Sequence, residues 1–196
     1  MPRAHKTQVE KADLKVAQIA GKARKHPATK AVGALSEVGD QPPLRTIAAA
    51  TMVAGALGRS SHLTAAGMRM LVAHQLATSA KSVIKGAVDR TRPEVVLDGD
   101  AYESGKGRHD QSRFNSFPSG HTAGAVAVAR AVGRDYPPLA VPAMLLAAGI
   151  AIAQVPRGKH YVSDVIAGAA IGLAADAVVE AVARWATGSP QSSPRV

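Results

Sequence analysis

Five apolar stretches of near-helical length follow one another along the chain and constrain its fold more than any other feature. They span Leu44–Gly58, Leu63–Ala80, Thr122–Val132, Leu139–Val155 and Val162 to about Trp185. A helix that crosses a bilayer needs about 20 residues, and several of these stretches are short and alanine-rich. Because 46% of the residues are hydrophobic but only 3% are aromatic, closely packed helices are favoured over aromatic-rich barrels or sandwiches. The sequence therefore predicts an all-α, membrane-embedded bundle of about five main helices.

The chain of 196 residues is long enough for one such bundle with extensions. Residues 1–40 are basic and, from about Leu14 to Ala34, weakly amphipathic with an interruption at Pro27. This pattern predicts an interfacial helix or helix pair on a membrane surface, with a solvated tail as the alternative. A Gly-Asp-Gln-Pro-Pro break at 39–43 leads into the bundle, expected over residues 41–187. Residues 188–196 are rich in Ser and Pro and are expected to be a disordered tail.

The net charge of +10 admits nucleic acid, anionic lipid or a phosphorylated substrate as a partner. Basic residues gather in residues 1–40 and between Lys81 and Arg113, which favours an anionic membrane surface. Aromatic residues are too few to stack on bases, so no nucleic-acid partner is expected. The N-terminus lacks the compact apolar stretch of a secretory signal, which disfavours a soluble exported enzyme. Without cysteine, the chain has neither disulfides nor thiolate metal sites.

Two further patterns bear on helix packing. Ionisable residues interrupt two of the apolar stretches: Arg69, His74, Asp176 and Glu180. Such groups are costly in a membrane helix unless they face the bundle interior or the interface, and the mean hydropathy of +0.02 keeps a soluble bundle as an alternative. Small residues recur in the last stretch: Gly168, Gly172 and Ala175. They allow a neighbouring helix to approach closely.

Residues capable of catalysis concentrate in three segments at the ends of the apolar stretches. In the first, Lys85 and Arg92 are seven positions apart and on a helix would share one face, before Pro93 forces the chain out of helix. An ammonium and a guanidinium together suit a phosphoryl group. Taken alone, however, a basic run beside a membrane helix is more often an anchor for lipid headgroups.

The second segment, Phe117–His121, opens directly into an apolar stretch. Ser119 is a natural N-cap, Gly120 lets a ligand approach the backbone, and the free N–H groups of the first helical turn make an anion site. His121 adds a titratable proton in that turn. The combination is more specific than a lone histidine.

The third segment, Arg157–Asp164, leads into the last apolar stretch. His160 and Asp164 are four positions apart and share a helical face, so the carboxylate could hold one imidazole N–H and aim the other nitrogen outward. An imidazole oriented in this way is a nucleophile. A plain surface pair is the alternative for this segment alone.

The three segments in this order resemble the signature of the type 2 phosphatidic acid phosphatase superfamily, which also includes bacterial acid phosphatases and vanadium haloperoxidases. The matching residues are Lys85…Arg92-Pro93, Pro118-Ser119-Gly120-His121 and His160…Asp164. The resemblance spans residues 44–185, and the three segments together are far more specific than any one of them.

This resemblance implies a metal-independent phosphatase without a cofactor. His160 would attack phosphorus, Asp164 would orient it, and His121 would protonate the leaving oxygen and then act as base when water hydrolyses the phosphohistidine. Cationic side chains and a helix N-terminus would hold the phosphate: Lys85, Arg92, Ser119 and Gly120.

One position departs from the family pattern. The third segment of the family usually has a Ser-Arg pair with Arg six residues before the nucleophilic His, whereas this chain has Ala153 and Gln154. Arg157 is expected to reach the phosphate instead, or Gln154 to donate a neutral hydrogen bond; lowered or lost activity is the third alternative. One lost charge-assisted contact is worth about 1.5–3 kcal/mol, so we expect an active enzyme with altered substrate preference.

Two helices before the first segment would place the basic N-terminus and the active site on the same membrane face. Positive charge is biased to the cytoplasm, so a cytoplasm-facing site in a bacterial inner membrane is expected. The polar loop from Glu94 to Asn115 is expected to form a lid or mouth. The expected substrate is a phosphomonoester or diphosphate of a membrane lipid. Polyprenyl mono- or diphosphates and polyprenyl phosphosugars rank slightly ahead of phosphatidate-like lipids, because narrow, Ala-lined helices suit a thin chain. A vanadate-dependent haloperoxidase and a non-catalytic lipid-binding scaffold are the alternatives.

Overall fold

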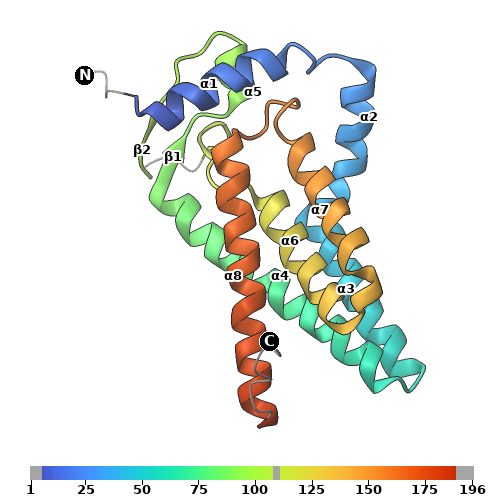
Figure 1. Cartoon of the computed structure of the whole chain (residues 1–196). Helices are drawn as coiled ribbons and strands as arrows, with labels where there is room; N and C mark the ends of the chain where they lie inside the picture. Colours follow the sequence, from blue (N-terminus) through green and yellow to red (C-terminus); the bar gives the residue numbers. More distant parts are fainter. Residues whose placement is uncertain (1–5, 108–110, 189–196) are drawn as a thin grey trace, which may run out of the picture.

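The computed structural model describes residues 6–107 and 111–188 and is predominantly helical (Figure 1). The α-helices are α1 (Gln8–Gly21), α2 (Pro27–Ser36), α3 (Gln41–Leu57), α4 (Ser61–Ala87), α5 (Pro93–Leu97), α6 (Gly120–Asp135), α7 (Ala140–Ala153) and α8 (Val162–Thr187). Short elements connect them: the 3₁₀ turns η1 (Glu37–Gly39), η2 (Ser112–Phe114) and η3 (Pro137–Leu139), and the strands β1 (Val88–Arg90) and β2 (Ser104–Lys106).

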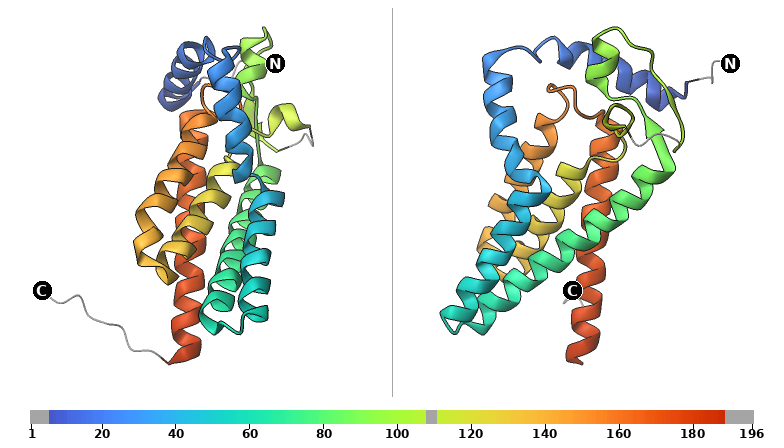
Figure 2. Two further views of the ribbon diagram at one scale, coloured as in Figure 1. Left: turned by 90° about the vertical axis from the view of Figure 1, so that its right-hand side faces the viewer. Right: turned by 180° about the vertical axis from the view of Figure 1, so that it is seen from behind.

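Five long helices, α3, α4, α6, α7 and α8, form the bundle, which confirms the predicted helical architecture. The basic N-terminal segment forms two helices, α1 and α2, separated before Pro27, which occupies the first turn of α2. α1 lies across one end of the bundle beside α5 in both the front and the rear view (Figures 1 and 2). The antiparallel pair β1 and β2 lies at this same end and was not predicted from the sequence.

The central helix of the bundle is α6, which contacts α3, α4, α7 and α8. Its Ala- and Val-rich sequence is buried almost throughout, so its neighbours pack close to its backbone. On α8, a Cβ atom at Gly168 would lie 2.5 Å from the carbonyl oxygen of Ser119, and one at Gly172 would lie 2.6 Å from that of Ala123. The predicted close approach at these glycines is confirmed, and it seats the start of α6 directly on α8.

Large exposed apolar side chains of the bundle lie on α3, α4, α7 and α8 and are most numerous on α7 and α8. Within the described residues, α8 is the one helix long and apolar enough to cross a membrane, over Val162–Ala186, and only 22% of its apolar window is buried. Large apolar side chains point outward from both helices: Val141, Leu145, Leu146, Ile152, Ile166, Leu173, Val178, Val182 and Trp185. Of the five apolar stretches expected to approach bilayer length, one forms a helix that is clearly long and apolar enough. The other helices are shorter or carry more polar residues.

The ionisable residues within the apolar stretches are mostly paired across helices. Arg69 of α4 donates to Asp135 at 3.1 Å and to Glu180 at 2.8 Å. Asp176 of α8, 1% exposed, accepts from both Nε and Nη2 of the Arg134 guanidinium. These pairs face the helix interfaces, as the sequence predicted for charge in such helices.

Candidate active site

The first predicted segment does not lie on one continuous helix. α4 ends at Ala87, and the chain then runs extended through β1, so the expectation that Lys85 and Arg92 share a helical face is wrong. The reason is tertiary: β1 pairs with β2, which removes residues 88–90 from the helix. Arg92 instead precedes α5, with Pro93 in its first turn.

The second segment forms the predicted helix start. The Ser119 hydroxyl caps α6 by accepting from the backbone N–H of Thr122 at 3.4 Å. The Ser119 N–H donates to the carbonyl oxygen of Asp164 at 3.0 Å, which ties this turn to the first turn of α8. The second and third segments, distant in sequence, therefore lie against each other.

His160 lies just before α8 and is only 4% exposed. Its Nδ1 atom lies 2.7 Å from the carbonyl oxygen of Ser116 and 3.8 Å from Oδ2 of Asp164. A carbonyl oxygen only accepts, so Nδ1 carries the proton and Nε2 keeps its lone pair. The Ser116 carbonyl rather than the Asp164 carboxylate thus makes the short contact that fixes the ring. Burial lowers the pKa of His160, against the raising effect of Asp164, and so favours the neutral imidazole.

Asp164 is fully buried and is fixed by three donors. Its carboxylate accepts from the Ser116 hydroxyl at 2.6 Å, from the backbone N–H of Tyr161 at 2.8 Å and from Arg90 Nη1 at 2.5 Å. At 3.8 Å from the imidazole, this negative charge stabilises a positive charge that develops on His160.

Arg90 and Asp13 extend this network into the N-terminal helix, and sequence reasoning missed both. The guanidinium of Arg90, which bonds Asp164, also donates to Asp13 of α1 at 2.8 Å and to the Ser163 hydroxyl at 2.7 Å. Asp13 is 5% exposed and also accepts from the Ser163 N–H at 3.1 Å. α1 carries two acids, Glu10 and Asp13, and nothing in the sequence distinguishes Asp13 as the buried one.

The two predicted phosphate-binding cations lie near His160, and both act on its pKa. The ammonium of Lys85 donates to the carbonyl oxygen of Asn115 at 2.5 Å, beside the residue that holds His160. Arg92 has a buried Nε atom without a hydrogen-bond partner in the part of the chain that the structure describes, and its Nη1 lies 3.9 Å from Glu94. Both side chains therefore keep donor capacity for an anion.

His121 faces the N-terminal segment. Its Nε2 atom is buried without a hydrogen bond to any described residue and lies 3.5 Å from the Glu37 carboxylate of η1. Burial raises the pKa of Glu37, but its bond with Arg157 and the nearby His121 outweigh this effect and lower it, so Glu37 is ionised. The segment predicted as a surface helix thus also places a carboxylate beside the predicted general acid.

Both candidates for the missing arginine charge are engaged elsewhere. Gln154 is fully buried, and its Nε2 donates to the carbonyl oxygen of Ile150 at 2.9 Å and to the Ser36 hydroxyl at 3.4 Å. The backbone carbonyl oxygen of Gln154 accepts from the backbone N–H of His160 at 3.3 Å, so this residue supports the loop that carries His160. Arg157 donates to the Ser36 hydroxyl at 2.8 Å and forms an ion pair with Glu37.

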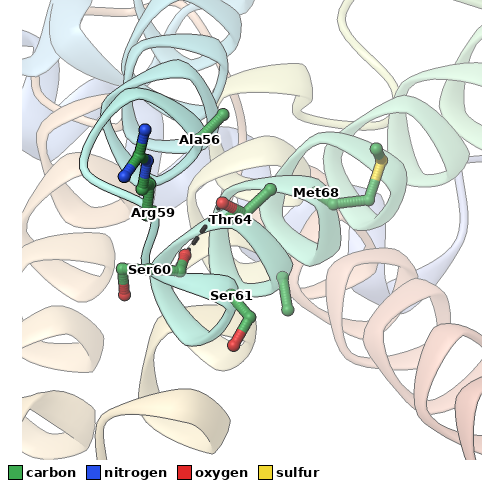
Figure 3. Close-up of a pocket in the computed structure, with 8 residues that line it drawn as sticks. Ala56, Arg59, Ser60, Ser61, Thr64 and Met68 are labelled. Atoms are coloured by element: carbon green, nitrogen blue, oxygen red, sulfur yellow. Dashed lines mark hydrogen bonds between the residues drawn. The ribbon is translucent and has the colours of Figure 1, made fainter.

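Glu37, Asp40 and His121 are the described residues that could hold a metal ion, with ligand atoms all within 4.8 Å of one another. Arg157 already pairs with Glu37, so a bound cation would compete with a guanidinium there. A separate hollow lies at the turn between α3 and α4, at the other end of the bundle (Figures 1 and 3). Neither a histidine nor a carboxylate lines it, so it offers no comparable chemistry.

Residues 66–187 match the PAP2 superfamily. The chain belongs to this superfamily. It is 34% identical over 121 residues to a decaprenylphosphoryl-5-phosphoribose phosphatase of Mycobacterium tuberculosis, covering 60% of this chain and 59% of that protein. It is 31% identical over 97 residues to a lipid A 1-phosphatase of Porphyromonas gingivalis, covering 47% of this chain and 22% of that protein. The chain thus spans less than two thirds of the length of these relatives.

Two solved structures share the fold of this PAP2 chain. One is a transmembrane PAP2-type phosphatidylglycerolphosphate phosphatase from Bacillus subtilis, with a TM-score of 0.64 at 21% identity over 96% of this chain and 91% of that one. The other is LpxE from Aquifex aeolicus, with a TM-score of 0.64 at 19% identity over 86% of this chain and 94% of that one. The predicted family is confirmed by the superfamily match, and the two solved structures confirm the fold.

Proposed function

We propose that this PAP2 chain is a lipid phosphatase that releases phosphate through a phosphohistidine on His160. The observation that carries the proposal is the buried imidazole whose Nδ1 is fixed 2.7 Å from the Ser116 carbonyl oxygen. This contact leaves Nε2 unprotonated and available for attack. The names of the relatives, both phosphatases of phosphorylated lipids, support a lipid phosphate as the substrate class.

In the first step, Nε2 of His160 attacks phosphorus and the bond to the lipid oxygen breaks. His121 gives its proton to that oxygen, and the Asp164 carboxylate, 3.8 Å from the ring, stabilises the positive charge on His160. Lys85 and Arg92 neutralise the phosphoryl oxygens, with the capped turn at Ser119 and Gly120 as an anion site.

In the second step, water attacks phosphorus of the phosphohistidine and the bond to Nε2 breaks. His121, now neutral, takes the proton from the water. Inorganic phosphate leaves, and both histidines return to their starting states. Because cationic side chains neutralise the charge on the phosphoryl group, the proposed reaction needs no divalent ion and no cofactor.

The membrane setting extends the proposal. α1, which carries part of the basic N-terminal charge, lies at the catalytic end of the bundle, which supports a site and a basic N-terminus on one membrane face (Figure 1). We propose a cytoplasm-facing site in a bacterial inner membrane, with α1 and α2 against anionic lipid. A cytoplasm-only reporter fused into loop 101–111 is expected to be active; its silence would refute this orientation.

Polyprenyl phosphates remain the first-ranked substrates, ahead of phosphatidate-like lipids. The decaprenyl substrate in the name of the Mycobacterium tuberculosis relative supports this order. The test is phosphate release from both lipid classes in detergent with EDTA, for the wild type and His160→Ala. We expect turnover by the wild type that is lost in the variant, whereas strict dependence on magnesium would contradict the mechanism.

The same experiment, with a peroxidase assay in added vanadate beside it, separates the alternatives. A non-catalytic lipid-binding scaffold predicts that His160→Ala changes nothing measurable. A vanadate-dependent haloperoxidase predicts peroxidase activity on addition of vanadate, with phosphate release absent.

A further inference from the structure

Lys81 is a buried cation that the mechanism above does not use. It lies one helical turn before Lys85 on α4 and is only 9% exposed. Within residues 6–107 and 111–188, its ammonium has no hydrogen bond and no ion pair within 4.0 Å. Among the described residues, the Asp40 carboxylate acts electrostatically on the Lys81 ammonium without forming an ion pair within 4.0 Å. An ammonium on a mostly buried side chain that has no protein partner keeps its donors available for a ligand.

The Lys81 side chain is aimed at the start of α6. A Cβ atom built on Gly120 would lie 3.4 Å from its Nζ and 3.6 Å from both Cδ and Cε. The N-terminus of a helix carries partial positive charge and free N–H groups, and so repels an ammonium. Two positive groups that face one another are stabilised when an anion lies between them. The pair therefore points to an anion at the Ser119–Gly120 turn.

The cations available around the site also point to Lys81 as a ligand of an anion. Position 154, where the family usually has arginine, is a glutamine that supports the His160 loop, and Arg157 is paired with Glu37. Gln154 is uncharged and the Arg157 guanidinium is already paired, so neither residue offers a free cation to the phosphate. Lys81 supplies one, and it approaches α6 from α4, beside Lys85.

We propose that Lys81 is a third cationic ligand of the substrate phosphate and makes up for the arginine absent at position 154. The proposal rests on the phosphatase function proposed above and specifies how its site holds the phosphoryl group. It also accounts for a buried lysine that neither the three motif segments nor the core packing requires.

The test compares wild type, Lys81→Met and the control Lys106→Met, an exposed lysine of β2. Inhibition of phosphatidate hydrolysis by orthovanadate and by inorganic phosphate is measured in detergent with EDTA. We expect both inhibition constants to rise about tenfold to hundredfold in Lys81→Met, the size typical of one charge-assisted hydrogen bond, and to stay unchanged in the control. An inhibition constant does not depend on the fraction of folded enzyme. Lys81→Gln gives the same readout if the methionine variant does not fold.

The outcomes separate the two proposals. If the wild type hydrolyses the lipid and vanadate inhibits all variants equally, Lys81 does not bind phosphate, although the phosphatase function stands. A Lys81→Met variant that melts at lower temperature with an unchanged inhibition constant would make Lys81 a structural counter-ion of Asp40 and overturn the inference. If the wild type releases no phosphate from any lipid, the proposed function itself fails. Vanadate-dependent thermal stabilisation of wild type, weakened only in Lys81→Met, would then still report an anion site at Lys81.

Discussion

Replacing Asp13 by alanine tests whether α1 is an integral part of the catalytic fold. The Asp13 carboxylate is 5% exposed and accepts from Arg90 at 2.8 Å and from the Ser163 N–H at 3.1 Å. Breaking a buried ion pair costs about 3–5 kcal/mol, and because Arg90 keeps Asp164 as a partner, we expect the lower end, about 3 kcal/mol. For a chain of this size, about 2–4 °C of melting temperature correspond to each kcal/mol, so the midpoint is expected to fall by about 6–12 °C.

The midpoint is measured by far-ultraviolet circular dichroism in detergent micelles. Asp98→Ala is the matched control, since Asp98 pairs with Arg24 at the surface with its side chain 62% exposed, and no measurable change is expected there. Asp13→Asn keeps an acceptor for Ser163 and is expected to fall between the two. If Asp13→Ala melts with the wild type, α1 is only a loosely attached segment, and the link from Asp13 through Arg90 to Asp164 does not stabilise the fold.

Three further outcomes are expected. Because burial lowers the pKa of His160 below its ordinary 6.5, the loss of kcat/KM caused by protonation of this imidazole is expected only below pH 6.5. An acidic limb with its midpoint well above pH 6.5 would contradict the neutral nucleophile. Gly168→Ala is expected to reduce turnover at least tenfold, since the added Cβ would lie 2.5 Å from the Ser119 carbonyl oxygen. Gly149→Ala is the control, because its added Cβ would have no described atom within 4 Å. Equal turnover of the two variants would argue against this packing. Arg157→Ala is expected to leave the inhibition constant of vanadate within about threefold of the wild-type value. The Arg157 guanidinium already pairs with Glu37 and so contributes less to anion binding than a free cation would. A tenfold rise in the inhibition constant would show that Arg157 binds the phosphate.

Local chemistry made parts of the site predictable. The N-cap at Ser119 follows from one side chain and the turn that it caps, and the close approach at Gly168 follows from residue size alone. The extended chain after Ala87 was not predictable in this way. It depends on pairing Val88 with Lys106, a contact set by the tertiary fold and not by the local sequence.

The partners of the site residues were the least predictable part. His160 is held by the carbonyl oxygen of Ser116, a backbone group that every residue offers and that leaves no sequence signal. Asp13 and Glu37 come from a segment whose basic composition suggested only a membrane surface, yet they contact Arg90 and His121 across the fold. Such contacts join residues far apart in the chain, so no local sequence pattern predicts them.

The most direct test of the account is to trap the covalent intermediate. Wild-type enzyme is mixed with a radiolabelled lipid phosphate in detergent with EDTA, quenched in alkali, where phosphohistidine is stable, and digested for peptide mapping. We predict label on the peptide that contains His160, stable in alkali, labile in acid and absent from His160→Ala. Label on a different residue, or label that forms only when magnesium is added, would contradict the assignment of His160 as a metal-independent nucleophile.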